Sequence, residues 1–193
     1  LFTGRLSLDA QPWVADHTVF GTVLMPGTGL VELALAAGRA VDCTTVDELT
    51  LEAPLVFADG VRVQVQVAVG EPSGDGGRPV AVYARPDHAV GEGEPEPEWV
   101  RHAHGVLTPD TADADASPID AAEPDAAERL AAEAWPPEGA EPVAVDGLYE
   151  RLAELGYEYG PAFQGVTAAW RRGDDLFAEV APGDAAGADA ARC

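Results

Sequence analysis

Valine alternates strictly with mostly polar residues at positions 61–69 (VRVQVQVAV). Successive side chains of a β-strand point to opposite faces, so this pattern predicts a strand with one buried and one solvated face. The valine face has to be covered by other elements before such a strand is stable. The rest of the chain must therefore supply partner strands and a covering layer.

A covering helix is predicted at residues 30–41 (LVELALAAGRAV), with Thr28 placed to cap it. Its apolar positions recur at helical spacing and share one face: Leu30, Leu33, Ala34 and Ala37. Because almost every residue in this segment is apolar, we expect the helix to be buried rather than to lie on a surface.

Further strands are predicted on both sides of this helix. They cover residues 1–8, 19–25, 49–57, 80–85 and 99–107. In the third of them, Pro54 marks a bulge or an edge. One buried helix wrapped by several antiparallel strands indicates an α+β fold.

The chain divides into three segments. Residues 108–142 are rich in Ala, Asp, Glu and Pro without sustained apolar periodicity, which indicates an acidic linker between units at 1–107 and 143–193. The second unit has a predicted helix at 145–155, ended by Gly156, and a hairpin of strands at 163–171 and 176–181 around a turn at 172–175. No core element follows, and the first residue is not Met, so we expect an excerpt from a longer polypeptide.

Composition limits the partners. The net charge of −23 disfavours binding to nucleic acid or to anionic membrane surfaces. With 47% hydrophobic residues, the chain can still bury a core. No apolar run approaches the roughly 20 residues of a membrane span, and no signal peptide is recognisable. Cys43 and Cys193 are expected to be free thiols in a reducing cytoplasm.

His17 is the leading candidate for chemistry. It stands at the mouth of a predicted strand, and Gly21 is expected to allow close backbone approach there. Pro26 and Gly27 then place the N-terminus of a helix nearby, where free amides can stabilise a developing oxyanion. Neutral imidazole can accept a proton near pH 7. On spacing alone, a structural histidine remains the competing interpretation.

Five segments together resemble one family. The first is PWxxDHxxxGxxxxPG at residues 12–27, which contains HxxxGxxxxP. The others are the opening strand LFTGRLSL with ELTLEAPL at 48–55, WVRHAHG at 99–105 and GYEYGPAFQG at 156–165. In their order along the chain they resemble the dehydratase domains of modular type I polyketide synthases, and the resemblance spans essentially the whole chain.

The resemblance implies a double hot-dog fold, with a first unit near completion and a second that is partial. It implies a hydro-lyase that dehydrates a β-hydroxyacyl thioester, carried on the phosphopantetheine of an acyl carrier protein, to an α,β-unsaturated thioester during polyketide elongation. His17 would abstract the α-proton, and the backbone amides of Gly27 and Thr28 are candidates to hold the thioester oxygen. No metal and no further cofactor is expected. The partners implied are the carrier protein, neighbouring synthase domains and a second copy of the synthase.

The segment GYEYGPAFQG at residues 156–165, called the second motif below, adds candidate residues; the first motif is the 12–27 segment. The Gly160–Pro161 turn is expected to bring Tyr157 or Tyr159 towards the substrate, with aromatic packing as the equal alternative. Phe163 and Gln164 are expected to form wall and scaffold rather than to react.

The family resemblance also implies an acid, an Asp followed four residues later by Gln or His. No Asp in the 193 residues meets this rule, so the chain alone is expected to be inactive. Three interpretations stay open: a dehydratase whose acid lies beyond residue 193, an inactive dehydratase-like structural domain, and another hot-dog thioester enzyme. A metal pair at His102 and His104, which share a strand face, is disfavoured because no carboxylate or Cys cluster accompanies them.

Overall fold

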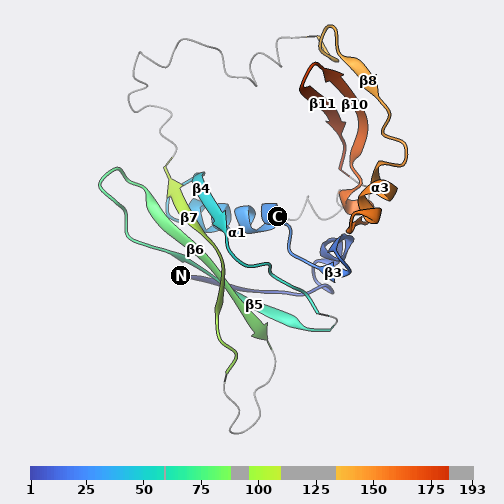
Figure 1. Ribbon diagram of the computed structural model, residues 1–193. Helices are drawn as coiled ribbons and strands as arrows, with labels where there is room; N and C mark the ends of the chain where they lie inside the picture. The colour runs from blue at the N-terminus through green and yellow to red at the C-terminus, as the bar shows by residue number, and fades with distance from the viewer. Residues whose placement is uncertain (59, 88–95, 110–133, 183–193) are drawn as a thin grey trace.

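The computed structural model describes residues 1–58, 60–87, 96–109 and 134–182 (Figure 1). Its larger sheet has five antiparallel strands in the order β1-β5-β6-β7-β4. Their bounds are β1 Phe2–Leu6, β5 Arg62–Val69, β6 Arg78–Asp87, β7 Val100–Thr108 and β4 Thr45–Leu51. Most of the 108–142 linker and residue Cys193 lie outside the described residues.

The valine alternation forms the strand that it predicts. Val63, Val65 and Val67 in β5 are buried, whereas Gln64 and Gln66 between them are half-buried on the opposite face. The strand lies inside the sheet, paired with β1 on one side and β6 on the other. The sequence pattern therefore predicted both the element and the face that it buries.

Helix α1 (Gly27–Arg39) covers the valine face of this sheet. It buries Leu30, Ala34 and Ala37 at the spacing of successive helical turns, as expected. The helix begins three residues before the predicted start, and Pro26 occupies the N-cap position with no side-chain cap. The cap assigned to Thr28 is therefore wrong, because Thr28 lies inside the first turn. Cys43, just beyond the helix, is a buried free thiol.

The C-terminal part of the chain forms a smaller sheet, β11-β10-β8, drawn in orange and red in Figure 1. Its strands are β8 Glu141–Val143, β10 Val166–Arg172 and β11 Asp175–Val180. The predicted hairpin is confirmed, with Gly173 in its turn at positive φ. Helix α3 is shorter than predicted, Leu148–Glu154, because Gly147 adopts a left-handed conformation before it.

A third sheet, β3-β2-β9, joins the two parts of the chain. Its strands are β2 His17–Val19, β3 Thr22–Val23 and β9 Tyr157–Tyr159. The single strand predicted at 19–25 is therefore wrong: the segment folds back on itself as a hairpin. The strand predicted at 49–57 also ends early, at Leu51, and only Val56 bridges onward, to Leu24.

Candidate active site

The hairpin of β2 and β3 explains the spacing between His17 and Gly21. Its two turn residues, Phe20 and Gly21, have φ of 49° and 71°, the left-handed pair that a type I′ turn needs. Glycine adopts this conformation without strain, unlike a residue with a Cβ. The close backbone approach expected at Gly21 is wrong, since no atom lies within 4 Å of where its Cβ would be.

The turn returns Leu24 to the side of His17. The Leu24 amide donates to the His17 carbonyl at 3.1 Å, and the Leu24 carbonyl lies 3.0 Å from Nδ1 of the His17 ring. A carbonyl oxygen only accepts, so this contact places the ring proton on Nδ1. Nε2 of the neutral imidazole then carries the free lone pair. The arrangement suits a general base.

Strand β9 holds the other edge of β2. His17 pairs with Tyr159 and Val19 with Tyr157. Outside the ladder, the Phe20 amide donates to the Gly156 carbonyl at 2.7 Å, and the Gly21 amide donates to Glu158 Oε2 at 3.0 Å. The first and second motifs, about 140 residues apart in sequence, are thus hydrogen-bonded to each other around His17.

Aromatic rings enclose the imidazole. The Tyr159 ring stacks on it with centroids 5.5 Å apart, and the Phe163 ring lies 5.1 Å away at a tilt of 55°. Trp13 packs behind Phe163, at 6.1 Å. Tyr157 lies one step farther out, 6.2 Å from Tyr159, and is 41% exposed. Tyr159 and Phe163 therefore contact the His17 ring, whereas Tyr157 lies at the solvent-exposed edge of this aromatic cluster.

The remaining residues of the second motif form the scaffold of this wall. Pro161 begins a one-turn 3-10 helix, η2 (Pro161–Phe163), which replaces the strand predicted from residue 163. The Gln164 amide nitrogen donates to the Tyr159 carbonyl at 2.6 Å. Gly160 lies against the side chain of Asp16. Asp16 is the acidic residue of the first motif, PWxxDHxxxG, but the sequence assigned no role to it.

The N-terminus of α1 lies on the Leu24 side of His17. Gly27 and Thr28 form its first turn, whose amides have no partner within a helix. A cavity of about 300 Å³ opens beside Gly27 and is bordered by Leu24 and the segment that follows β4. Its other lining residues are Met25, Leu30, Leu51, Glu52, Ala53, Pro54 and Leu55.

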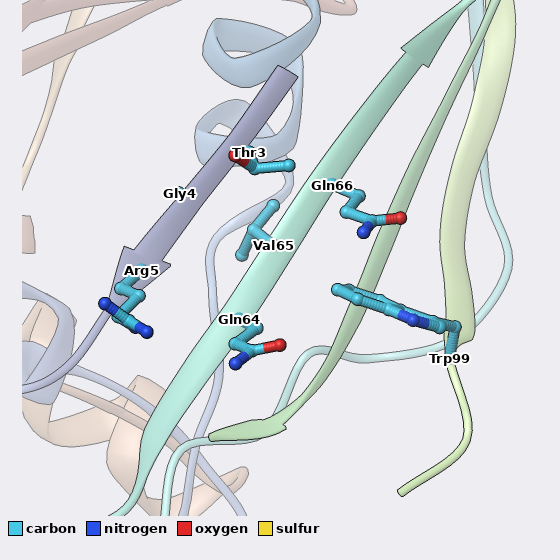
Figure 2. Close-up of a pocket in the computed structure, with 7 residues that line it drawn as sticks. All are labelled: Thr3, Gly4, Arg5, Gln64, Val65, Gln66 and Trp99. Atoms are coloured by element: carbon cyan, nitrogen blue, oxygen red, sulfur yellow. The ribbon is translucent and has the colours of Figure 1, made fainter. Parts of the chain in front are cut away.

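A wider cavity, of about 520 Å³, lies on the face of the large sheet that carries Gln64 and Gln66, opposite the buried valines. Figure 2 shows Gln64, Gln66 and Trp99 around it, with β1 alongside; Thr3, Gly4, Arg5 and Val65 complete its lining. None of these residues belongs to the His17 cluster. We therefore place the candidate site at the His17 cluster, because its imidazole can act as a base, and not at the cavity with the greater volume.

The two histidines of β7 have separate roles. His102 is buried with its Nδ1 2.9 Å from the Ala53 carbonyl, whereas His104 is partly exposed beside Glu52, which also forms an ion pair with Arg101. Within the described ranges, no group of three His, Cys, Asp or Glu could hold a metal ion. Nor is any helix there long and apolar enough to cross a bilayer.

Two family profiles match the chain. Residues 1–85 match one described as "Polyketide synthase dehydratase domain", and residues 127–193 match "Polyketide synthase dehydratase N-terminal domain". The chain is 54% identical over 194 residues to the pikromycin polyketide synthase component PikAII of Streptomyces venezuelae. It is 50% identical over 186 residues to the mycoketide-CoA synthase of Mycobacterium tuberculosis. These alignments cover 100% and 96% of the chain, but only 5% and 4% of the two synthases.

Solved structures show the same likeness. The dehydratase domain of the terminal module of the rifamycin polyketide synthase superposes with a TM-score of 0.80 at 44% identity, over 98% of this chain and 63% of that one. The erythromycin dehydratase superposes with a TM-score of 0.75 at 43% identity, over 94% of this chain and 60% of the erythromycin dehydratase chain. The chain thus spans less than two thirds of these domains. The α+β, hot-dog fold class predicted from the sequence is confirmed.

Proposed function

Since this chain belongs to the dehydratase domains of type I polyketide synthases, we propose that it supplies the catalytic base for removing water from a β-hydroxyacyl thioester. The substrate is carried on the phosphopantetheine of an acyl carrier protein, and the product is the α,β-unsaturated thioester. In the elimination the base takes the α-proton, a C=C bond forms, and the β C–O bond breaks as the hydroxyl leaves with the acid's proton as water. No external oxidant or reductant is needed, and the proposal includes no metal and no further cofactor. Neighbouring synthase domains and a second copy of the synthase are the proposed partners.

His17 is the proposed base. The contact between its Nδ1 and the Leu24 carbonyl is the observation that carries this assignment, because it leaves the lone pair of Nε2 free to take the α-proton. The thioester carbonyl acidifies that proton by accepting the negative charge. The Gly27 and Thr28 amides, at the positive end of α1, are the proposed donors to the resulting oxyanion.

The hydroxyl group leaves as water only if an acid protonates it. The family resemblance implies an Asp for this role, and none of the Asp residues here has Gln or His four positions later. We assign the acid to the part of a dehydratase domain that this chain does not span. Tyr159 and Tyr157 are proposed to line the substrate channel, with Phe163 as its wall; Tyr159, stacked on His17, is the nearer of the two tyrosines to the base.

The test is turnover by a longer protein that adds the C-terminal remainder of the domain to this chain. A β-hydroxyacyl chain on carrier protein is supplied, and mass spectrometry follows the loss of one water. Enoyl product in the wild type, lost in His17→Ala, supports the proposal. Free acid without enoyl product indicates a thioester hydrolase instead. A folded protein that releases neither indicates an inactive structural domain.

A further inference from the structure

We propose that Asp16 is a positioning residue for His17, an inference that rests on the proposed function. Asp16 is the last residue of the 3-10 helix η1 (Pro12–Asp16) and directly precedes the base. Its carboxylate crosses to the second motif, where Oδ2 accepts the Ala162 amide at 2.8 Å. Its backbone carbonyl accepts the Gly160 amide, also at 2.8 Å. One residue therefore binds the turn of that motif twice.

The turn needs such a partner. Its N-cap residue, Gly160, has no side chain with which to bind the amides at the start of η2. Asp16 accepts the Ala162 amide from 146 residues away in sequence, and a carboxylate makes a stronger bond there than a neutral group. Phe163, the last residue of η2, packs on His17. Holding this turn in place therefore also holds Phe163 against the His17 ring.

Gly160 is shaped to receive Asp16. Its φ of −81° is open to any residue, so its conformation does not require glycine. A Cβ at this position would instead lie 2.5 Å from Cγ of Asp16. Glycine is needed here for space, and the carboxylate fills that space. Asp16 and Gly160 thus form a fitted pair that joins the two motifs.

The consequence is orientational. The Leu24 carbonyl fixes one nitrogen of the His17 ring, and the Tyr159 and Phe163 rings fix its plane. Removing the Asp16 carboxylate releases the Phe163 side of this enclosure. A displacement of about 1 Å in a reacting group can cost on the order of 100-fold in rate. The effect should fall on kcat, because Asp16 acts through the base and not on the substrate.

The first test compares Asp16→Ala, Asp16→Asn and the matched control Asp47→Ala, an exposed aspartate of β4, in the longer active protein. Asp16→Ala should lower kcat by about 10- to 100-fold with KM nearly unchanged. Asp16→Asn should stay within about fivefold of wild type, since its amide carbonyl still accepts the Ala162 amide. Asp47→Ala should match wild type. Equal loss in both Asp16 variants, or none in either, would overturn the proposal.

The second test needs no turnover. NMR follows the imidazole Cε1–H signal of His17 in the 193-residue chain, where the neighbouring rings shift it. The chemical shift of this signal should change in Asp16→Ala and stay at the wild-type value in Asp16→Asn. As a single substitution, Gly160→Ala should change the chemical shift of this signal. Added to Asp16→Ala, it should cause little further change, because the two residues act as a pair. An unmoved signal in Asp16→Ala refutes positioning, whereas a wild type without turnover refutes only the proposed function.

Discussion

The ring of His17 lies nearly parallel to that of Tyr159, with centroids 5.5 Å apart and planes inclined by 19°. The two residues are also directly paired in the β2–β9 ladder, although 142 positions separate them in sequence. Backbone pairing and ring stacking therefore set the orientation of the imidazole together. Disturbing either should change the reaction before it unfolds the protein.

Substitutions of Tyr159 separate its ring from its hydroxyl. Tyr159→Ala removes the stacking surface, and we expect kcat to fall by about tenfold or more, as for a mispositioned base. Tyr159→Phe keeps the stack, so kcat should stay near wild type while KM rises if the hydroxyl meets the substrate as proposed. Steady-state kinetics of the longer protein measures both, with Tyr83→Phe in the large sheet as control. Unchanged kinetics in Tyr159→Ala would remove this residue from the site.

Gly21→Ala tests the turn. A Cβ at φ of 71° costs about 1–2 kcal/mol, so the free energy of unfolding in urea should fall by roughly that amount. Gly74→Ala is the matched control, since Gly74 lies in a loop with open space and no positive φ. We expect the control to change stability by less than about 0.5 kcal/mol. Equal effects at the two positions would argue against a left-handed conformation at Gly21.

Glu52 gives the fold a pH dependence. Its hydrogen bond with the Arg101 guanidinium, helped by His104, holds the pKa of the Glu52 carboxyl below its ordinary value of 4.5. The folded state therefore favours the ionised form, and this stabilisation is full above about pH 4.5 and is lost as the pH falls through the lower folded-state pKa.

Glu52→Gln should accordingly lower the urea midpoint at pH 7 and match wild type at the acid end of the series. Glu48→Gln, at an exposed position of β4, changes the same charge and should show no such pH trend. A Glu52→Gln deficit that persists undiminished into strong acid would show that the ion pair is not its cause.

Hydrogen exchange should distinguish the five-stranded sheet from the β11-β10-β8 sheet. Strands β5, β6 and β7 bury side chains against α1, whereas no residue of β8, β10 or β11 is buried. Leu176 and Val180 in β11 are 72% and 70% exposed. We expect amides of β10 and β11 to exchange faster than those of β6, because local opening there costs less free energy. Equal protection in both sheets would contradict this.

Much of the fold followed from local pattern. The β5 alternation and the apolar face of α1 predicted their elements because burial of one face dominates both. The 17–25 hairpin did not follow, since its turn residues Phe20 and Gly21 lack the usual Asn-Gly signal and residues 19–25 (VFGTVLM) are apolar apart from Gly21 and Thr22. The sequence pattern there fitted a single strand equally well.

The site was predictable in part. His17 and the second motif stood out through their resemblance to a family, and the structure brings them together. Strand β9 is three residues long and exists because β2 pairs with it, so no local periodicity reveals it. The role of Asp16, a residue of the first motif, was missed because its partner, the Ala162 amide, is a backbone group that a sequence pattern does not reveal.

The proposed function depends above all on His17 acting as the base. The direct measurement is kcat/KM for enoyl formation by His17→Ala in the longer protein, beside His104→Ala as a matched histidine control. We predict a loss of about 10²–10⁴-fold for His17→Ala, an unchanged fold and near wild-type activity for the control. Near-complete activity in His17→Ala would show that His17 is not the base.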